Sequence, residues 1–202
     1  TYIFVFVRDS LKLSPFFSMG IAGRYIRSDL KITSESGSKS ANSLGVDVSA
    51  YYQGREFQFI DNSNGLFRFG INISNIGPRL NYDVGGKKNF IPTNLKFGTG
   101  LDLILDSSNI FGFYLEFNKL LVPSPVSSYN ESGVFQGYKQ PDISFLKGII
   151  TSFNDAEDGF KEEFQEITYA IGLEYRFAKA FSIRSGYFYE NENKGTRKYL
   201  TM

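Results

Sequence analysis

Hydrophobic and polar residues alternate along much of this chain with a period of two. In "TYAIGLEYRF" (168–177), tyrosine, isoleucine, leucine and phenylalanine alternate with alanine, glycine, glutamate and arginine. Such alternation predicts a β-strand with one apolar face. In a soluble sheet that face packs on a core, whereas in a membrane barrel it contacts lipid and the polar face lines the interior. The fold class depends on which arrangement holds.

The same pattern, bounded by turn residues, predicts nine strands, several of about the 9–11 residues that a tilted strand needs to cross a bilayer. The predicted ranges are 2–8, 16–29, 44–53, 65–75, 94–105, 110–120, 166–178, 181–190 and 197–202.

The polar faces of these strands carry charges of both signs, mostly beside glycine, alanine or serine. The charged residues are Arg24, Asp47, Arg68, Lys96, Asp102, Glu116, Glu174, Arg176 and Arg184. Glycine weakens a solvent-facing strand, but a barrel interior crowded with paired long side chains has room only for small neighbours. The pattern therefore favours an all-β fold, an antiparallel transmembrane outer-membrane β-barrel. We interpret Glu174 and Arg176 as an interior ion pair and assign no catalytic residues.

The lengths of the connections support the same fold. Among the eight connections the three longest, 30–43, 76–93 and 121–165, are all even-numbered. In an up-and-down barrel they would emerge on one side, as the long extracellular loops of outer-membrane barrels do.

The longest connection is expected to contain a short helix. Ile143, Leu146, Ile150 and Phe153 follow helical spacing, and an acidic turn and the amphipathic "FKEEFQE" come next. This element either docks a protein or lids the barrel, or it simply packs on the nearby strands.

Composition removes most other function classes. The 202 residues carry a net charge of +1 and contain no cysteine and no histidine, so thiolate sites, the commonest metal ligand and the commonest general base are absent. We expect no enzyme, no cofactor and no nucleic-acid partner. The carboxylates Asp155, Glu157 and Asp158 lack the ligand spacing of a calcium loop, so no metal is expected either.

The ends of the chain suggest a piece of a larger barrel. No run of about 18 apolar residues predicts a membrane-spanning helix. The first residues already form an apolar strand, and "RKYLTM" ends inside another. We therefore expect residues 1–202 to be a single barrel domain that lacks its N- and C-terminal strands.

Four segments carry a family resemblance: "ISNIGPRLNYDVGGKKNFIPTNLKFG", "FNKLLVPSP", "GIITSFNDAEDGFKEEFQEI" and "IRSGYFYENENKGTRKYLTM". They resemble the PorV (LptO-like) family, outer-membrane barrels of the type IX secretion system, and the likeness runs over most of the chain from "GRYIRSDL" onward. It implies a FadL-like barrel with 14 strands in the complete protein, of which eight or nine lie here.

The resemblance also implies a function and partners. Such proteins collect secreted cargo by its C-terminal signal domain as it leaves a SprA-type translocon, and deliver it to a PorU-type attachment complex. Outer-membrane lipid or lipopolysaccharide would surround the barrel.

Partner contacts are expected in the loops at 76–93 and 121–165. Large apolar residues in a long outer loop indicate an interaction surface. The candidate residues are Arg79, Asn81, Tyr82, Phe145, Leu146, Ile149 and Ile150.

Two other functions stay open at this point. A FadL-like transporter of hydrophobic small molecules would share the architecture but would need an apolar channel. A soluble β-sandwich or lipocalin-like binding protein would pack the apolar face inward. Such a fold does not explain why the three longest connections are all even-numbered.

Overall fold

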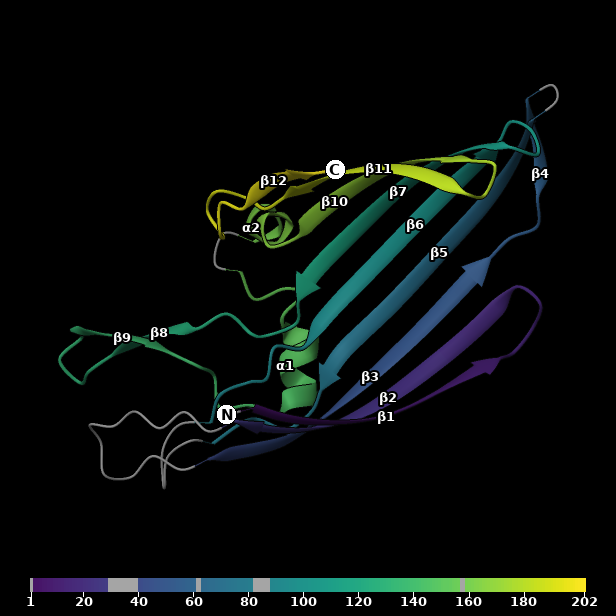
Figure 1. Cartoon of the computed structure of the whole chain (residues 1–202). Coiled ribbons are helices and arrows are strands. Elements are labelled where there is room, and N and C mark those ends of the chain that lie inside the picture. The colour runs from purple at the N-terminus through teal and green to yellow at the C-terminus, as the bar shows by residue number, and fades with distance from the viewer. Residues whose placement is uncertain (1, 29–39, 61–62, 82–87, 157–158) are drawn as a thin grey trace.

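The computed structural model describes residues 2–28, 40–60, 63–81, 88–156 and 159–202, and of residues 2–6 and 28 the backbone alone. A single antiparallel sheet dominates it (Figure 1). The strands are β1 (Tyr2–Lys12), β2 (Phe17–Ser28), β3 (Ala41–Gln53), β4 (Phe57–Ile60), β5 (Ser63–Ile76), β6 (Asn94–Ile104), β7 (Asn109–Leu120), β8 (Val126–Tyr129), β9 (Phe135–Lys139), β10 (Thr168–Phe177), β11 (Phe181–Tyr189) and β12 (Lys198–Thr201), with helices α1 (Phe145–Thr151) and α2 (Phe160–Gln165).

All nine predicted strands are present, and the all-β fold is confirmed. They lie in the order β1-β2-β3-β5-β6-β7-β10-β11-β12, each antiparallel to its neighbour. The described strands do not close into a barrel, because β1 and β12 end this order without pairing with each other.

The structure differs from the prediction in its short elements. β4 lies in the expected connection 54–64 and pairs with β5, while β8 and β9 form a separate hairpin inside 121–165. β1 extends to Lys12 rather than ending near residue 8, since backbone pairing with β2 continues through polar residues. Two short helices replace the one that was expected. None of the described helices is long and apolar enough to cross a membrane.

Strand register separates the side chains onto two faces, since directly paired residues share a face. On the polar face Gly70 pairs with Gly98, Gly98 with Glu116, and Glu116 with Ala170. On the other face Phe97 pairs with Phe117. The two faces match those predicted from the alternation.

Aromatic rings form a row across the apolar face. It runs Tyr52, Phe69, Phe97, Phe117, Tyr169 and Tyr189, one ring from each of β3, β5, β6, β7, β10 and β11, with neighbouring centroids 5.5 to 6.4 Å apart. Such spacing suits edge and tilted ring contacts. The rings thus link six strands on the apolar face.

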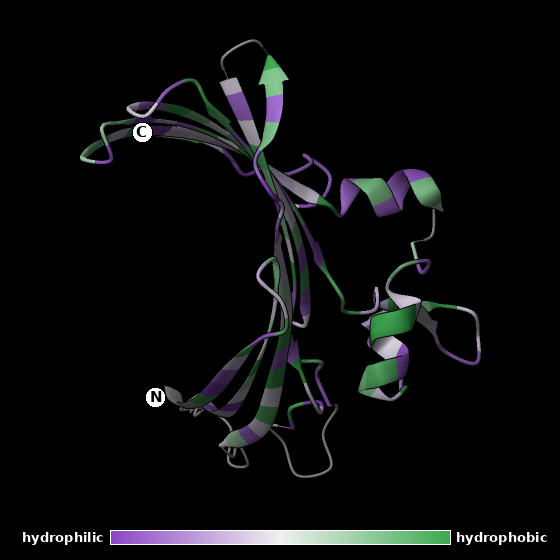
Figure 2. Ribbon diagram, turned by 90° about the vertical axis from the view of Figure 1, so that its right-hand side faces the viewer, coloured by the Kyte–Doolittle hydropathy of each residue, from purple (hydrophilic) through white to green (hydrophobic). Residues whose placement is uncertain are grey.

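No second layer covers the apolar face among the described residues. Phe113, Leu173 and Ile183 are 45%, 51% and 57% exposed. Figure 2 shows a curved sheet in which hydrophobic and hydrophilic residues alternate along the strands, with both helices on its convex side. The few buried apolar side chains, Ala41, Leu80, Ile91 and Leu121, come from strand ends and loops rather than from a core beneath the sheet.

The helices and the β8–β9 hairpin lie at one end of the strands, and β4 at the other (Figure 1). This arrangement follows from the antiparallel order, in which alternate connections emerge at the same end. The predicted parity of the long connections is therefore confirmed for their described parts.

Candidate partner-binding surface

The predicted contact residues fall into two groups. Leu146 and Ile150 are exposed on α1, while Phe145 and Ile149 on the same helix are half-buried. Arg79 and the exposed Asn81 lie in the segment that follows β5, and Tyr82 lies outside the described residues. Whether these residues contact a partner stays a prediction.

Arg79 joins the two groups. Its guanidinium donates hydrogen bonds to the Lys88 carbonyl at 2.7 Å and to the Ile143 carbonyl at 3.2 Å, and forms an ion pair with Asp142 at 2.9 Å. It also lies 4.7 Å from the ring centroid of Phe90. The segment containing Arg79 is thereby fixed to the start of α1, so that the two predicted loops form one surface.

Local sequence explains the position of α1. The Ser144 hydroxyl accepts a hydrogen bond from the Lys147 backbone N–H at 3.3 Å, a common N-cap arrangement. A Cβ at Gly148 would lie 2.8 Å from Phe90 and 3.0 Å from Pro123. Because glycine allows this close approach, the opposite side of the helix, with Leu146 and Ile150, is turned to solvent, where these residues are 57% and 73% exposed.

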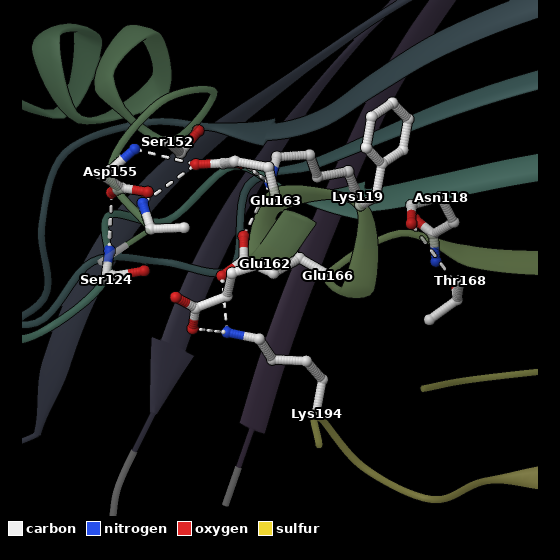
Figure 3. Close-up of polar contacts among 12 residues, drawn as sticks. Asn118, Lys119, Ser124, Ser152, Asp155, Glu162, Glu163, Glu166, Thr168 and Lys194 are labelled. Atoms are coloured by element: carbon white, nitrogen blue, oxygen red, sulfur yellow. Dashed lines mark hydrogen bonds and ion pairs between the residues drawn. The ribbon is translucent and has the colours of Figure 1, made fainter. Parts of the chain in front are cut away.

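Helix α2 is held by two lysines, one near the end of β7 and one in the β11–β12 connection (Figure 3). The Lys119 ammonium lies 2.8 Å from Glu163 and 2.7 Å from Glu166. Lys194, in the connection between β11 and β12, lies 2.6 Å from Glu162 and 3.1 Å from Glu166. A lysine of β7 and a lysine of the β11–β12 connection therefore bind three carboxylates in α2 and at its C-cap.

Glu163 also organises the turn between the helices. It accepts the backbone N–H groups of Asp155 and Ala156 at 2.9 and 3.1 Å. Burial alone would raise the pKa of Glu163, but the hydrogen bond from Lys119 and these two N–H groups lower it on balance. Burial raises the pKa of Asp155, although the N–H of Ser124 opposes that shift.

Three acidic residues lie close together around α2, and Lys119 pairs with two of them. Glu157 and Asp158, considered in the sequence, lie outside the described residues. Asp155, Glu163 and Glu166 place carboxylate oxygens within 4.8 Å of one another. Lys119 already supplies a positive charge to two of them, so the cluster has its counter-charge within the chain.

Three exposed phenylalanines extend the surface beyond the predicted residues. Phe153 follows α1, and Phe160 and Phe164 lie on α2; they are 47%, 76% and 64% exposed. The sequence could have indicated the pair on α2, because Phe160 and Phe164 are four positions apart and therefore lie on one face of a helix. We call Leu146, Ile150 and Phe153 the α1 patch and Phe160 and Phe164 the α2 patch.

The polar face of the sheet carries ion pairs, including the predicted pair of Glu174 with Arg176. Asp102, only 2% exposed, accepts bonds from Arg68 at 2.5 Å, from Tyr114 at 2.9 Å, and from Arg176. Glu174 lies 3.3 Å from Arg176 and 2.7 Å from Arg184. Further pairs join Arg24 to Asp47, and Lys96 to Glu116. The predicted pair of Glu174 and Arg176 is thus present within β10, and most of the other pairs join neighbouring strands.

Glycines make room for this network. A Cβ at Gly100 would lie 2.7 Å from the Tyr114 ring, and one at Gly112 would overlap the same ring. Tyr114 can therefore lie flat along the sheet and reach both Asp102 and Glu174 with its hydroxyl.

Comparison with known proteins identifies one family. The family model described as "Type IX secretion system protein PorV" matches residues 3–127, which is more than half of the chain. No curated protein matches the chain. The match begins earlier than the resemblance seen in the sequence, and it includes Arg79 but ends before α1 and α2.

Proposed function

The chain belongs to the PorV family of type IX secretion system proteins, and we propose that it acts in the bacterial outer membrane as a non-enzymatic carrier of secreted cargo. Membership makes it a component of type IX secretion. Its location, its cargo and its partners are the parts that we propose.

The observation that carries the membrane location is the division of the sheet into two faces. An apolar face six strands wide, linked by an aromatic row, is exposed, while charged residues on the other face are paired among glycines. Exposed apolar patches on soluble monomers rarely exceed a few hundred Å². A barrel wall with lipid outside and ion pairs inside accounts for both faces.

The proposed role in secretion is the capture of cargo by its C-terminal domain. The barrel would receive cargo from a SprA-type translocon and deliver it to a PorU-type attachment complex. The α1 patch supports this role, because exposed apolar side chains on a fixed helix at the end of a barrel are typical of protein contact sites. Arg79 would hold the patch in place through its bonds to residues 88 and 143.

Site-specific photo-crosslinking in secreting cells tests this contact. A photoreactive amino acid at position 146 or 150 is expected to form adducts with cargo, whereas one at Leu173, on the apolar strand face, is expected to form none. In parallel, Leu146→Glu with Ile150→Glu should reduce cargo transfer. Normal transfer by this double variant, in a barrel that assembles normally, would contradict the proposed contact.

A second candidate function is transport of a small hydrophobic molecule. It is favoured by a hollow of about 520 Å³ on the polar face, bordered by Gly70, Gly98, Tyr114 and Gly172. A Cβ at Gly98 would meet only the Leu115 carbonyl oxygen, at 3.8 Å, so the position has space for a larger side chain. If this function holds, the purified protein should retain a fatty acid that Gly98→Leu displaces.

A further inference from the structure

Helix α2 has the reverse of the polarity expected for a helix on the surface of a soluble protein. Its carboxylates face the protein: Glu163 is 7% exposed, and Glu162 and Glu166 are paired with lysines. Its large apolar side chains, Phe160 and Phe164, face outward. A surface helix in water normally buries its apolar stripe and exposes its charges.

The position of α2 explains this reversal. Lys119 pairs with Leu95 across the strands and therefore belongs to the apolar face. The Tyr169 hydroxyl, from the same face, lies 3.5 Å from the Phe164 carbonyl. The helix is thus tied to the convex, apolar side of the sheet, at the end where the long connections emerge (Figures 1 and 2).

We propose that α2 is an interfacial anchor, in which Phe160 and Phe164 insert into the acyl layer at the rim of the membrane. The α2 patch continues the aromatic and aliphatic face of the strands, so one apolar medium covers both. Side chains of this kind bury themselves at the boundary between headgroups and acyl chains. The exposed Lys161, next to Phe160, can extend its ammonium into the headgroup layer.

Insertion of α2 into the membrane would explain why its charged residues face the protein. With Phe160 and Phe164 in lipid, charges on the outer side of the helix would be costly, so they are collected on the inner side and neutralised by Lys119 and Lys194. The same bonds fix the height of α2 relative to the end of β7. The inference rests on the proposed membrane location.

Tryptophan fluorescence with brominated lipids tests the anchor, because the 202 residues contain no tryptophan. The full-length protein, with any tryptophan outside this chain replaced by phenylalanine, would carry Phe164→Trp, Leu173→Trp or Tyr138→Trp and be reconstituted in phospholipid vesicles. Leu173 lies on the apolar strand face, and Tyr138 is 69% exposed on the β8–β9 hairpin. Lipids brominated high in the acyl chain quench only residues within the membrane.

We expect loss of fluorescence for Phe164→Trp and Leu173→Trp, and none for Tyr138→Trp. Quenching of Leu173→Trp without quenching of Phe164→Trp would overturn the anchor and leave the membrane location standing. In that case acrylamide, a quencher dissolved in water, would be added to Phe164→Trp with and without partner proteins. Protection only in the presence of the partners would identify α2 as a protein-docking helix instead. No quenching of Leu173→Trp would overturn the proposed location and the anchor together.

Discussion

The Nζ atom of Lys119, one residue before the end of β7, lies 2.8 Å from the Oε2 atom of Glu163 in α2. Both side chains are nearly buried, with 8% and 9% of their surface exposed. This bond joins the end of a sheet strand to a helix 44 residues further along the chain. Together with the bonds of Lys194, it therefore holds α2 near the end of β7.

Replacing Lys119 should release α2. Lys119→Met leaves the buried Glu163 without its partner, and breaking a buried ion pair from one side typically costs on the order of 3 kcal/mol. We expect faster amide hydrogen exchange over 155–166, with exchange in β6 and β10 unchanged. The matched control is Lys194→Met, whose partners are more exposed and whose effect should be smaller. Equal exchange in Lys119→Met and the parent protein would contradict the role of this bond.

The attachment of α2 should weaken in acid. Because the pKa of Glu163 in the folded protein lies below its ordinary 4.5, its stabilising contribution is complete above pH 4.5 and is lost as the pH falls from there through the folded value. Hydrogen exchange over 155–166 should therefore accelerate below pH 4.5, after correction for the intrinsic rate. The raised pKa of Asp155 acts in the opposite direction. Glu163→Gln isolates the contribution of Glu163, and an unchanged acid transition in that variant would refute this assignment.

Asp102 should be the most sensitive charge on the polar face. Asp102→Asn removes the negative charge shared by Arg68 and Arg176, so we expect a loss of about 3 kcal/mol in the free energy of unfolding. Glu116→Gln is the control, because its pair with Lys96 is nearly half exposed and such pairs contribute about 1 kcal/mol at most. Urea unfolding in lipid vesicles measures both. Equal losses would show that burial of Asp102 has no energetic role.

The turn between β10 and β11 offers a stabilising change. Ala178 and Lys179 have φ angles of 51° and 57°, and the Ala180 N–H donates to the Phe177 carbonyl at 3.1 Å. Phe177 pairs with Phe181, so three residues, 178–180, connect the strands, and asparagine and glycine adopt the positive φ angles of positions 178 and 179 at a lower cost than alanine and lysine. Ala178→Asn with Lys179→Gly should raise stability by about 1 kcal/mol, seen as a higher urea midpoint. A lower midpoint would indicate that the alanine or lysine side chain makes a stabilising contact.

The strands could be predicted from the sequence because their signal is local. Alternation such as that of 168–177 depends only on neighbouring residues, and it also assigns Glu174 and Arg176 to the polar face. The short strands β4, β8 and β9 were missed because four or five residues give too few alternations, and "FQGYK" in β9 has none that separates it from a loop.

The position of the helices could not be predicted in the same way. Helical spacing located the apolar side of α1, but the pairing of Lys119 with Glu163 depends on how the long connection folds back. The outward direction of Phe160 and Phe164 follows from that pairing. Closure of the barrel likewise depends on which residues pair with β1 and β12. The alternation of apolar and polar residues does not contain that information.

The most direct test of the account is the environment of two adjacent residues on β10. Leu173 is 51% exposed on the apolar face, while the Glu174 side chain is 11% exposed among the ion pairs of the polar face. Single cysteines at these positions, carrying an environment-sensitive probe in the full-length protein in vesicles, should report lipid at 173 and none at 174. A probe at 173 that is shielded from lipid, in a protein that also stays monodisperse without detergent, would contradict the membrane account and its function in secretion.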